Sequence, residues 1–576
     1  MKDKKEDIIK SIDCNLLDFI RSNSAFNADD EILSYAGISY DYKRFCGLVD
    51  KTIRILSSIP YLQSGDKVVI GLVTSPETIA LIYACNYISL VPVLVDVRLS
   101  AREYRKIIIE SGSKIAFLAD FNARQTNVIS DAPCLKKLFI VSPIQSAAKK
   151  KQFFWGIACF FLGSRYMFQQ KKIPKLSTWA KFLQMDPGEG NEVQYTMGTA
   201  DTEIIFATSG STGKRKFVIQ TARALNYNVL FNEFYFDMKD PSITSEITIL
   251  PIFACSGFSS CIHMPLYYGK KIFVHQVYDF RKMADAMIEI KPNIVVGSVG
   301  MWEHFLHSEK INNADLSFLK ICICSGEKVE EKRLAEMNSI LEGHGSDSKL
   351  LQVYGMTELT VVSLLSPDDY NPSSVGKPIP MVDVCVVDEG TENELPIGST
   401  GEICVHSMGM MKGYWQNSEA TEKALRAHSD GRTYLHTGDI GRIDDDGFLF
   451  FEGRMKNIHV SISGTKIFTP EIEESVREMD GITNCAAVVC KSEGRNDVTS
   501  IILFAEIQKG SPLNRRAVHK IMKHCHETLP MFLMPDKVVV MDQIPVTSSG
   551  KTDYQSLQQQ ADAFAMKQKI TVINVK

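Results

Sequence analysis

The chain has 576 residues with a formal net charge of −4, and 45% of its residues are hydrophobic. One hydrophobic core does not extend over so many residues, so we expect at least two domains. The near-neutral charge supplies no basic field that would draw the chain to nucleic acid. Fourteen scattered cysteines include no CxxC pair. This usage favours reduced thiols and argues against a disulfide framework or a zinc site.

The N-terminus reads MKDKKEDIIKSIDC, which is charged and lacks the apolar stretch of a signal peptide. No run of 18 or more apolar residues occurs, so no membrane-spanning helix is expected. Together with the cysteine usage, these features predict a cytoplasmic location.

Residues 65–120 alternate between strand and helix patterns. KVVIGLV, VPVLVDV and KIAFLAD are short apolar runs typical of buried strands, and two stretches with helical spacing separate them. Ser75 and Pro76 suit the start of the first helix. Such alternation predicts an α/β fold with parallel strands covered on both faces.

The rhythm breaks in a segment of about residues 144–193, which we interpret as an insertion. It holds an apolar run, Phe153–Gly163, bracketed by lysines. Packing on the sheet explains this run, and a helix lying in a membrane interface explains it as well. The second interpretation predicts peripheral contact with the inner membrane surface through residues 149–172. The run is too short to span a bilayer.

FATSGSTGKRK, from Phe206 to Lys216, lies between two apolar strand patterns and has the composition of a phosphate-binding loop. Glycines let backbone N–H groups converge on an anion, and hydroxyl and lysine side chains add donors and charge. A Walker loop is excluded, because Thr208 stands at its first glycine and Arg215 follows Gly213-Lys214. The candidate phosphate ligands are Thr208, Ser209, Gly210, Ser211, Thr212, Gly213, Lys214 and Lys216.

Near residues 444–453, DDDGFLFFEG has the signature of a short β-hairpin. The pattern then changes to a smaller α+β unit, in which Thr469 and Pro470 suit a helix start. We therefore predict a large domain over residues 1–453, with mixed and parallel sheets and flanking helices, and a small α+β domain over 454–576.

The phosphate loop closely resembles that of the adenylate-forming superfamily, which includes acyl-CoA synthetases, peptide-synthetase adenylation domains and luciferases. That family usually has proline where Arg215 stands. The resemblance extends over nearly the whole chain, because further strings follow in the family's order: YGMTE (354–358), GEICVHSMGMMKGYW (401–415), YLHTGD (434–439), GRMKNIHVSISGTKIFTPEIE (453–473) and PVTSSGK (545–551).

The resemblance implies a ligase that joins a carboxylic acid to ATP, giving an acyl-adenylate and pyrophosphate. It implies catalytic roles for Thr357, Glu358 and Lys551, with Glu358 binding Mg²⁺ through the ATP phosphates. Lys551 would bridge the acid and the nucleotide. The remaining nucleotide contacts implied are Tyr354 at adenine with its neighbour Gly355, Asp439 at ribose, Arg454 at ribose or phosphate, and Gly326 and Glu327 at the adenine edge.

The same resemblance implies transfer of the acyl group to a thiol after rotation of the small domain. The hinge position matches Lys456, and Ser463 and Gly464 match the segment near the thiol. The acceptor expected first is coenzyme A. The alternative acceptor is the phosphopantetheine arm of an acyl carrier protein. A different class of function, a catalytically inactive nucleotide-binding protein, is the other hypothesis.

One position bears on the class of acid. Ala254 stands where amino-acid-activating relatives have aspartate, and a buried ammonium without a carboxylate partner is costly. We therefore expect a fatty or other apolar acyl acid, with an aryl acid as the alternative. The residues assigned to the acid pocket are Phe253, Ala254, Gly257 and Gly297.

Overall fold

The computed structural model describes residues 2–23, 27–120, 126–142, 175–188, 194–208, 216–275, 283–455, 458–460, 466–491, 499–508, 511, 516–529, 533–547 and 550–571. The chain divides into two compact units. Unit 1 comprises Met1–Thr208, Lys216–Asp383 and Val405–Leu435, and unit 2 comprises Ser209–Arg215, Val384–Cys404 and His436–Lys576. The domain boundary expected near Arg454 stays a prediction.

Unit 1 contains an eight-stranded sheet in the order β19-β9-β8-β4-β3-β5-β6-β7. The strands β3, β4 and β5 are parallel, as the alternation over residues 65–120 predicted, and α4 begins at Pro76 with Ser75 as its N-cap. The bounds are β3 (Lys67–Gly71), β4 (Val91–Leu94), β5 (Ile115–Ala119), β6 (Lys137–Val141), β7 (Leu176–Thr178), β8 (Glu203–Thr208), β9 (Lys216–Thr221) and β19 (Gly413–Tyr414).

Helices cover this sheet because its strands are apolar on both faces. Val69, Ala116 and Leu118 belong to one core cluster together with Tyr104 and Ile108 of α5. The helices of this part are α3 (Tyr42–Ser57), α4 (Pro76–Tyr87), α5 (Ala101–Ser111), α6 (Thr126–Ser130) and α8 (Trp179–Leu183).

Part of the expected insertion is regular structure. The strand β7 pairs in parallel with β6, and Trp179 and Phe182 of α8 stack 4.9 Å apart in the core. The described residues between 175 and 188 thus continue the sheet. The run Phe153–Gly163 and the proposed membrane contact at 149–172 lie outside the described residues.

A nine-stranded sheet, also in unit 1, has the order β16-β15-β14-β13-β12-β10-β11-β1-β2. Its central strands β10, β12, β13 and β14 are parallel. The bounds are β1 (Glu31–Tyr35), β2 (Ile38–Asp41), β10 (Ser245–Thr248), β11 (Lys271–Val274), β12 (Ile294–Ser298), β13 (Ile321–Ser325), β14 (Leu350–Met356), β15 (Thr360–Leu364) and β16 (Lys377–Pro378).

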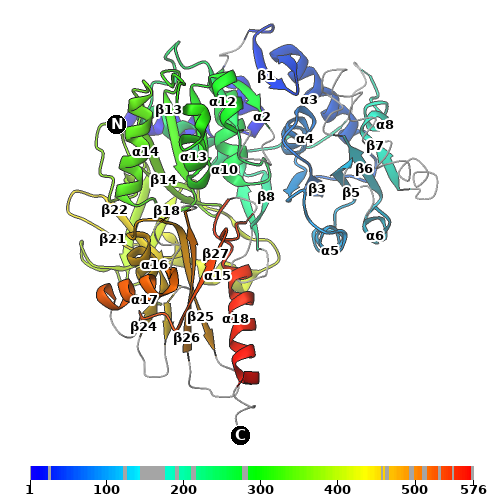
Figure 1. Cartoon of the computed structure of the whole chain (residues 1–576). Coiled ribbons are helices and arrows are strands. Elements are labelled where there is room, and N and C mark those ends of the chain that lie inside the picture. The colour runs from blue at the N-terminus through cyan, green and yellow to red at the C-terminus, as the bar shows by residue number, and fades with distance from the viewer. Residues whose placement is uncertain are drawn as a thin grey trace. The chain divides into compact units, whose positions relative to one another are not determined.

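Helices follow these strands along the chain and lie beside the sheet (Figure 1). One continuous helical stretch after β10 contains a π-helical turn, Ser259–His263. The bounds are α10 (Cys255–Phe258), α11 (Met264–Tyr267), α12 (Met283–Ile290), α13 (Val299–Leu306) and α14 (Glu331–Gly343), and elsewhere in unit 1 α1 (Lys2–Ser11), α2 (Leu16–Ser22), α9 (Ala222–Leu230) and α15 (Ser418–Ala424).

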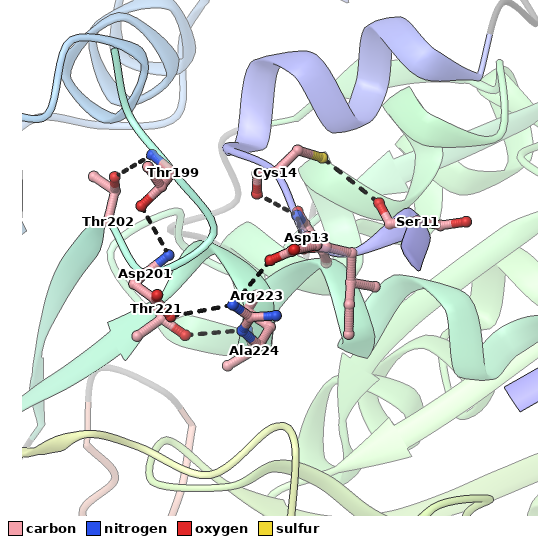
Figure 2. A network of polar contacts seen from close by, with 11 residues as sticks. Ser11, Asp13, Cys14, Thr199, Asp201, Thr202, Thr221, Arg223 and Ala224 are labelled. Atoms are coloured by element: carbon pink, nitrogen blue, oxygen red, sulfur yellow. Dashed lines mark hydrogen bonds and ion pairs between the residues drawn. The ribbon is translucent and has the colours of Figure 1, made fainter. Parts of the chain in front are cut away.

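The N-terminal segment of unit 1 is tied to α9 by polar contacts (Figure 2). The Arg223 guanidinium lies 2.9 Å from an Asp13 carboxylate oxygen and 3.4 Å from one of Asp201. The side-chain amide of Asn226, one helical turn further, donates to the Ile12 carbonyl at 3.2 Å and the Cys14 carbonyl at 3.0 Å. These contacts fix the chain between α1 and α2 against the body of unit 1.

Unit 2 is built around the three-stranded sheet β25-β26-β27. Alternate residues of β25 face opposite cores: Cys485 and Ala487 pack with α16 and α17, while Ala486 and Val488 pack with α18. This alternation follows from the two-residue side-chain period of a strand. The bounds are β23 (Ile458–Val460), β24 (Lys466–Phe468), α16 (Thr469–Arg477), β25 (Ile482–Lys491), β26 (Thr499–Ile507), α17 (Ala517–Thr528), β27 (Lys537–Met541) and α18 (Tyr554–Thr571).

Four further strands are β17 (Val382–Val387), β18 (Gly401–Ser407), β20 (Leu425–Ala427) and β21 (Thr433–Ile443), and β21 pairs antiparallel with β22 (Leu449–Arg454). This pair is the hairpin expected from DDDGFLFFEG. With the parallel sheets of unit 1 and the α+β core of unit 2, the expected fold class is confirmed. None of the described helices is long and apolar enough to cross a membrane.

Candidate active site

The two ends of the phosphate loop are fixed by a β-hairpin. β8 and β9 are antiparallel, with Thr208 directly opposite Lys216. The Nζ atom of Lys216 lies 4.4 Å from the centre of the Tyr414 ring. The loop itself, and with it the candidate ligands Ser209, Gly210, Ser211, Thr212, Gly213 and Lys214, lies outside the described residues, as does the side chain of Thr208.

Three of the candidate segments stand at one edge of the nine-stranded sheet. Ser298 at the end of β12 is level with Ser325 at the end of β13, and Ser325 is level with Val353 of β14. The three strands are parallel, so the segments containing Gly297, Gly326-Glu327 and Tyr354–Glu358 emerge at the same carboxyl edge. In open α/β sheets, ligands bind in the crevice at this edge.

YGMTE forms a tight bend between β14 and β15. The register of the two strands shifts between Tyr354 and Gly355, and a Cβ atom on Gly355 would lie 2.1 Å from the Thr360 carbonyl oxygen. The Leu359 N–H donates to the Met356 carbonyl at 3.0 Å and closes the turn. The bend therefore needs glycine at position 355, and it leaves Thr357 and Glu358 half-buried.

Glu358 is held by a residue to which the sequence assigned no role. The Tyr414 hydroxyl donates to Glu358 Oε1 at 2.9 Å, and the Met411 N–H donates to the Glu358 carbonyl at 2.7 Å. Tyr414 lies on β19, opposite Val218 of β9. The same tyrosine thus touches the candidate metal ligand and the lysine that ends the phosphate loop. One hint of a role for Tyr414 was present in the sequence, its position in MMKGYW, which is part of a string that resembles the family.

Thr357 is positioned through its backbone. The Gln220 side-chain amide, from β9, donates to the Thr357 carbonyl at 2.7 Å and to the Gly409 carbonyl at 3.4 Å. These contacts connect the YGMTE turn to β9, the strand that follows the phosphate loop. They fix the backbone from which the Thr357 hydroxyl and the Glu358 carboxylate project.

The expected acid-pocket residues fall into two groups. Phe253 and Ala254 are half-buried in the segment between β10 and α10. Gly257 has a packing reason to be glycine, because a Cβ there would lie 2.0 Å from the Pro251 carbonyl oxygen. A Cβ on Gly297 would lie 3.4 Å from Trp302 Nε1, which is an ordinary van der Waals contact. The small size of Gly257 is therefore no evidence of an open pocket.

Cys255 connects this segment to Glu358. Burial, and after it the charge of Glu358, raises the pKa of the Cys255 thiol to about 12. The thiol is thus neutral at physiological pH, and the segment Phe253–Gly257 lies within electrostatic reach of the candidate metal ligand.

The SGE segment after β13 is exposed at Gly326 and Glu327, with Gly326 at a φ of +101°. The Gln352 amide donates to the Glu327 carbonyl at 3.3 Å. This arrangement presents backbone groups at the carboxyl edge, where the sequence expected contacts to the adenine edge.

In unit 2, the two candidate ribose ligands lie opposite each other on β21 and β22. Arg454 Nε is 2.7 Å from Asp439 Oδ1; the Asp439 side chain is 0% exposed and that of Arg454 is 41% exposed. The sequence expected both to contact the nucleotide. In the structure they form an ion pair, in which the buried aspartate orients the partly exposed guanidinium.

Lys551 of unit 2 is exposed on a tight turn between β27 and α18. The turn is closed by an antiparallel bridge between Val546 and Thr552. The hinge candidate Lys456 and the thiol-segment candidates Ser463 and Gly464 lie outside the described residues.

The family model "AMP-binding enzyme" matches residues 20–415, and the model "AMP-binding enzyme C-terminal domain" matches residues 471–551. These matches cover more than half of the chain, so the chain belongs to the AMP-binding enzyme family. The resemblance to adenylate-forming enzymes seen in the sequence is thereby confirmed.

Among curated proteins, the long-chain-fatty-acid–CoA ligase of Escherichia coli O6:H1 is 26% identical over 365 residues. That match spans 63% of this chain and 62% of the relative, which is less than two thirds of its length. The indoleacetate–CoA ligase of Aromatoleum aromaticum is 24% identical over 518 residues, 88% of this chain and 91% of that protein.

Among solved structures, ATP-bound MatB from Rhodopseudomonas palustris matches with a TM-score of 0.79 and 20% identity, covering 96% of this chain and 100% of that one. The fatty acyl CoA synthetase of Mycobacterium tuberculosis matches with a TM-score of 0.68 and 20% identity, covering 96% and 99%. At this level of identity the two matches establish the fold.

Proposed function

We propose that this chain activates a carboxylic acid with ATP, releases pyrophosphate and transfers the acyl group from the acyl-adenylate to the thiol of coenzyme A. The observation that carries the proposal is the convergence of Gly297, Gly326 and the Tyr354–Glu358 turn at one carboxyl edge of parallel strands, with Glu358 oriented by Tyr414. Membership of the AMP-binding enzyme family supports it.

The donor set at the YGMTE turn fits Mg²⁺. Tyr414 engages Oε1 of Glu358, so Oε2 is the natural ligand for a hard cation, and the Thr357 hydroxyl adds an oxygen nearby. Bound Mg²⁺ would neutralise charge on the ATP phosphates. Lys216, above the Tyr414 ring, would supply a further positive charge at the end of the phosphate loop.

The reaction needs no nucleophile from the protein. The acid's own oxygen attacks the α-phosphorus and pyrophosphate leaves, so the protein contributes positioning and electrostatic stabilisation. In this proposal Lys551 orients the acid against the nucleotide, while Tyr354 stacks on adenine. Arg454, oriented by Asp439, contacts the ribose.

For the acid we propose a fatty or other apolar acyl chain. Ala254 supplies no carboxylate for a substrate ammonium, which argues against an α-amino acid. The E. coli relative is named for long-chain fatty acids and the A. aromaticum relative for indoleacetate. Because indoleacetate carries an aromatic ring, an aryl acid is the alternative substrate class.

Acid-dependent exchange between pyrophosphate and ATP tests the proposal. Purified protein with ATP, Mg²⁺ and a panel of acids (octanoate, palmitate, indoleacetate, benzoate and leucine) should give exchange with an aliphatic acid and none with leucine. Exchange with an aryl acid alone would show that the substrate is an aryl acid and not an aliphatic one. Nucleotide binding without exchange on any acid would favour a catalytically inactive binding protein.

A second experiment decides the acceptor. The acyl-adenylate formed from the preferred acid is offered coenzyme A or a phosphopantetheinylated acyl carrier protein, and the thioester is followed by mass spectrometry. We expect acyl-CoA. Acylation of the carrier protein alone would assign the alternative, an acyl-AMP ligase that loads a carrier in trans.

A further inference from the structure

The backbone around Lys551 is closed into a small ladder. The Thr547 N–H donates to the Lys551 carbonyl at 2.6 Å, and the Lys551 N–H donates to Thr547 Oγ1 at 3.3 Å. The Asp553 N–H donates to the Pro545 carbonyl at 2.8 Å, at the base of the same turn. These hydrogen bonds join Lys551 and Asp553 to Thr547 and Pro545, so the position of the Lys551 backbone depends on what holds the base of the turn.

Tyr554, the first residue of α18, comes immediately after this base. Its hydroxyl lies 2.9 Å from both carboxylate oxygens of Glu473 on α16. Burial and the neighbouring carboxylate raise the pKa of Tyr554 well above its ordinary value, so the phenol stays protonated and donates. A residue three positions after the lysine is therefore hydrogen-bonded to another helix.

Glu473 is itself fixed from three directions. Besides Tyr554, the Ala487 N–H of β25 donates to Glu473 Oε1 at 2.8 Å, and the Arg477 guanidinium lies 3.1 Å from Oε2. The carboxylate is buried, so leaving it without these donors is costly. All these groups lie in unit 2, and they join α16, β25 and α18.

We propose that Tyr554 and Glu473 are positioning residues that fix the orientation of Lys551. The pair holds the start of α18 against α16, and the ladder from Pro545 to Asp553 carries that constraint to the lysine. This inference rests on the proposed function, because it assumes that Lys551 acts when the acid is adenylated. Small displacements of a positioning group cost large factors in rate, up to about 10²-fold for 1 Å.

A purely structural role for the pair predicts a different result. Destabilising unit 2 would slow adenylation and thioester formation together. Loss of lysine orientation slows adenylation alone, because the acyl-adenylate is already formed when the thiol attacks. The two half-reactions therefore separate the two roles.

The test compares Tyr554→Phe and Glu473→Gln with Gln558→Leu as a matched control. Gln558 also lies on α18 and donates to the Val489 carbonyl of β25 at 3.1 Å, one turn further from the lysine. For Tyr554→Phe we expect acid-dependent pyrophosphate exchange to fall about tenfold, with thioester formation from supplied acyl-adenylate within twofold of wild type. Gln558→Leu should leave both rates unchanged.

Amide hydrogen exchange gives a readout that needs no turnover. In Tyr554→Phe, the amides of Lys551 and Asp553 should exchange faster, while those of β26 stay protected. Unchanged protection at these amides, equal loss in both half-reactions, or the same loss in Gln558→Leu would overturn the inference. Wild-type exchange that does not depend on Lys551 would instead overturn the proposed role of the lysine, and the inference with it.

Discussion

Two tyrosines donate hydrogen bonds to glutamates, one in each unit, and their settings differ. Tyr414 of unit 1 holds Glu358, which is itself the candidate metal ligand. Tyr554 of unit 2 holds Glu473, which is buried, while the candidate catalytic lysine stands three residues away on an exposed turn. In our proposals, Tyr414 orients a metal ligand directly, whereas Tyr554 orients the catalytic lysine through the backbone. The consequences of removing each hydroxyl should differ accordingly.

The largest effect is expected on substitution of Lys551, the lysine that we propose is oriented by the Tyr554–Glu473 contact. Lys551→Ala should lower acid-dependent pyrophosphate exchange by about 10²- to 10³-fold, because a charge that stabilises the transition state is lost. ATP affinity by calorimetry and the melting temperature should stay near wild type, since the side chain is exposed. Lys523→Ala, an exposed lysine of α17 in the same unit, is the control. Normal exchange in Lys551→Ala would refute the role.

The corresponding substitution in unit 1 is Glu358→Gln. It keeps an oxygen that accepts from Tyr414 but removes the charge that would bind Mg²⁺. We expect exchange to fall about 10²-fold at fixed Mg²⁺ and to recover in part at higher Mg²⁺ concentrations. Glu331→Gln, on the surface of α14, should behave as wild type. An unchanged Mg²⁺ dependence would place the metal elsewhere.

Tyr414→Phe sharpens the comparison of the two hydroxyls. Loss of one hydrogen bond to a carboxylate costs about 1.5–3 kcal/mol when it is fully expressed. Full expression corresponds to at least about a tenfold change. The expected result is a rise of up to about tenfold in the Mg²⁺ concentration for half-maximal exchange, because part of the loss is compensated by water, and weaker Mg²⁺-dependent ATP binding by calorimetry. Tyr554→Phe should not shift either quantity. Equal shifts in the two variants would erase the distinction drawn between them.

The last prediction concerns stability rather than turnover, and it contrasts Glu473 with a second buried carboxyl. Among the described residues, no hydrogen bond within normal limits reaches either carboxylate oxygen of Glu246 on β10, although the Cys261 thiol lies beside it. Burial raises the pKa of Glu246 well above its ordinary value. The native state therefore binds a proton that the unfolded chain releases, and stability falls as pH rises above the unfolded pKa, until the folded pKa is reached.

Glu246→Gln removes this dependence. The free energy of unfolding of the variant should exceed that of wild type increasingly with pH, by at most about 1.4 kcal/mol per pH unit within that interval. Denaturant titrations at pH 5, 7 and 8.5 measure the difference. A difference that stays constant or shrinks with rising pH would show the carboxyl to be ionised in the native protein.

Local patterns predicted much of the fold, and long-range pairing explains what they missed. The strands of residues 65–120 could be read because they are buried on both faces and therefore continuously apolar. Tyr414 could not be assigned to Glu358, because this contact depends on β19 pairing with β9, far away in the sequence. The hairpin that holds Asp439 and Arg454 was expected, but their ion pair depends on its register, which shifts between Ile440 and Gly441 and has no signal in the sequence pattern.

The crowding at Gly355 has a consequence for mutational scanning of this chain. Any side chain there meets the Thr360 carbonyl oxygen whether or not a nucleotide is bound. Intolerance at position 355 will therefore report the shape of the bend. Thr357 and Glu358 carry no such backbone requirement, so comparison with position 355 separates the shape of the bend from the chemistry of these two side chains.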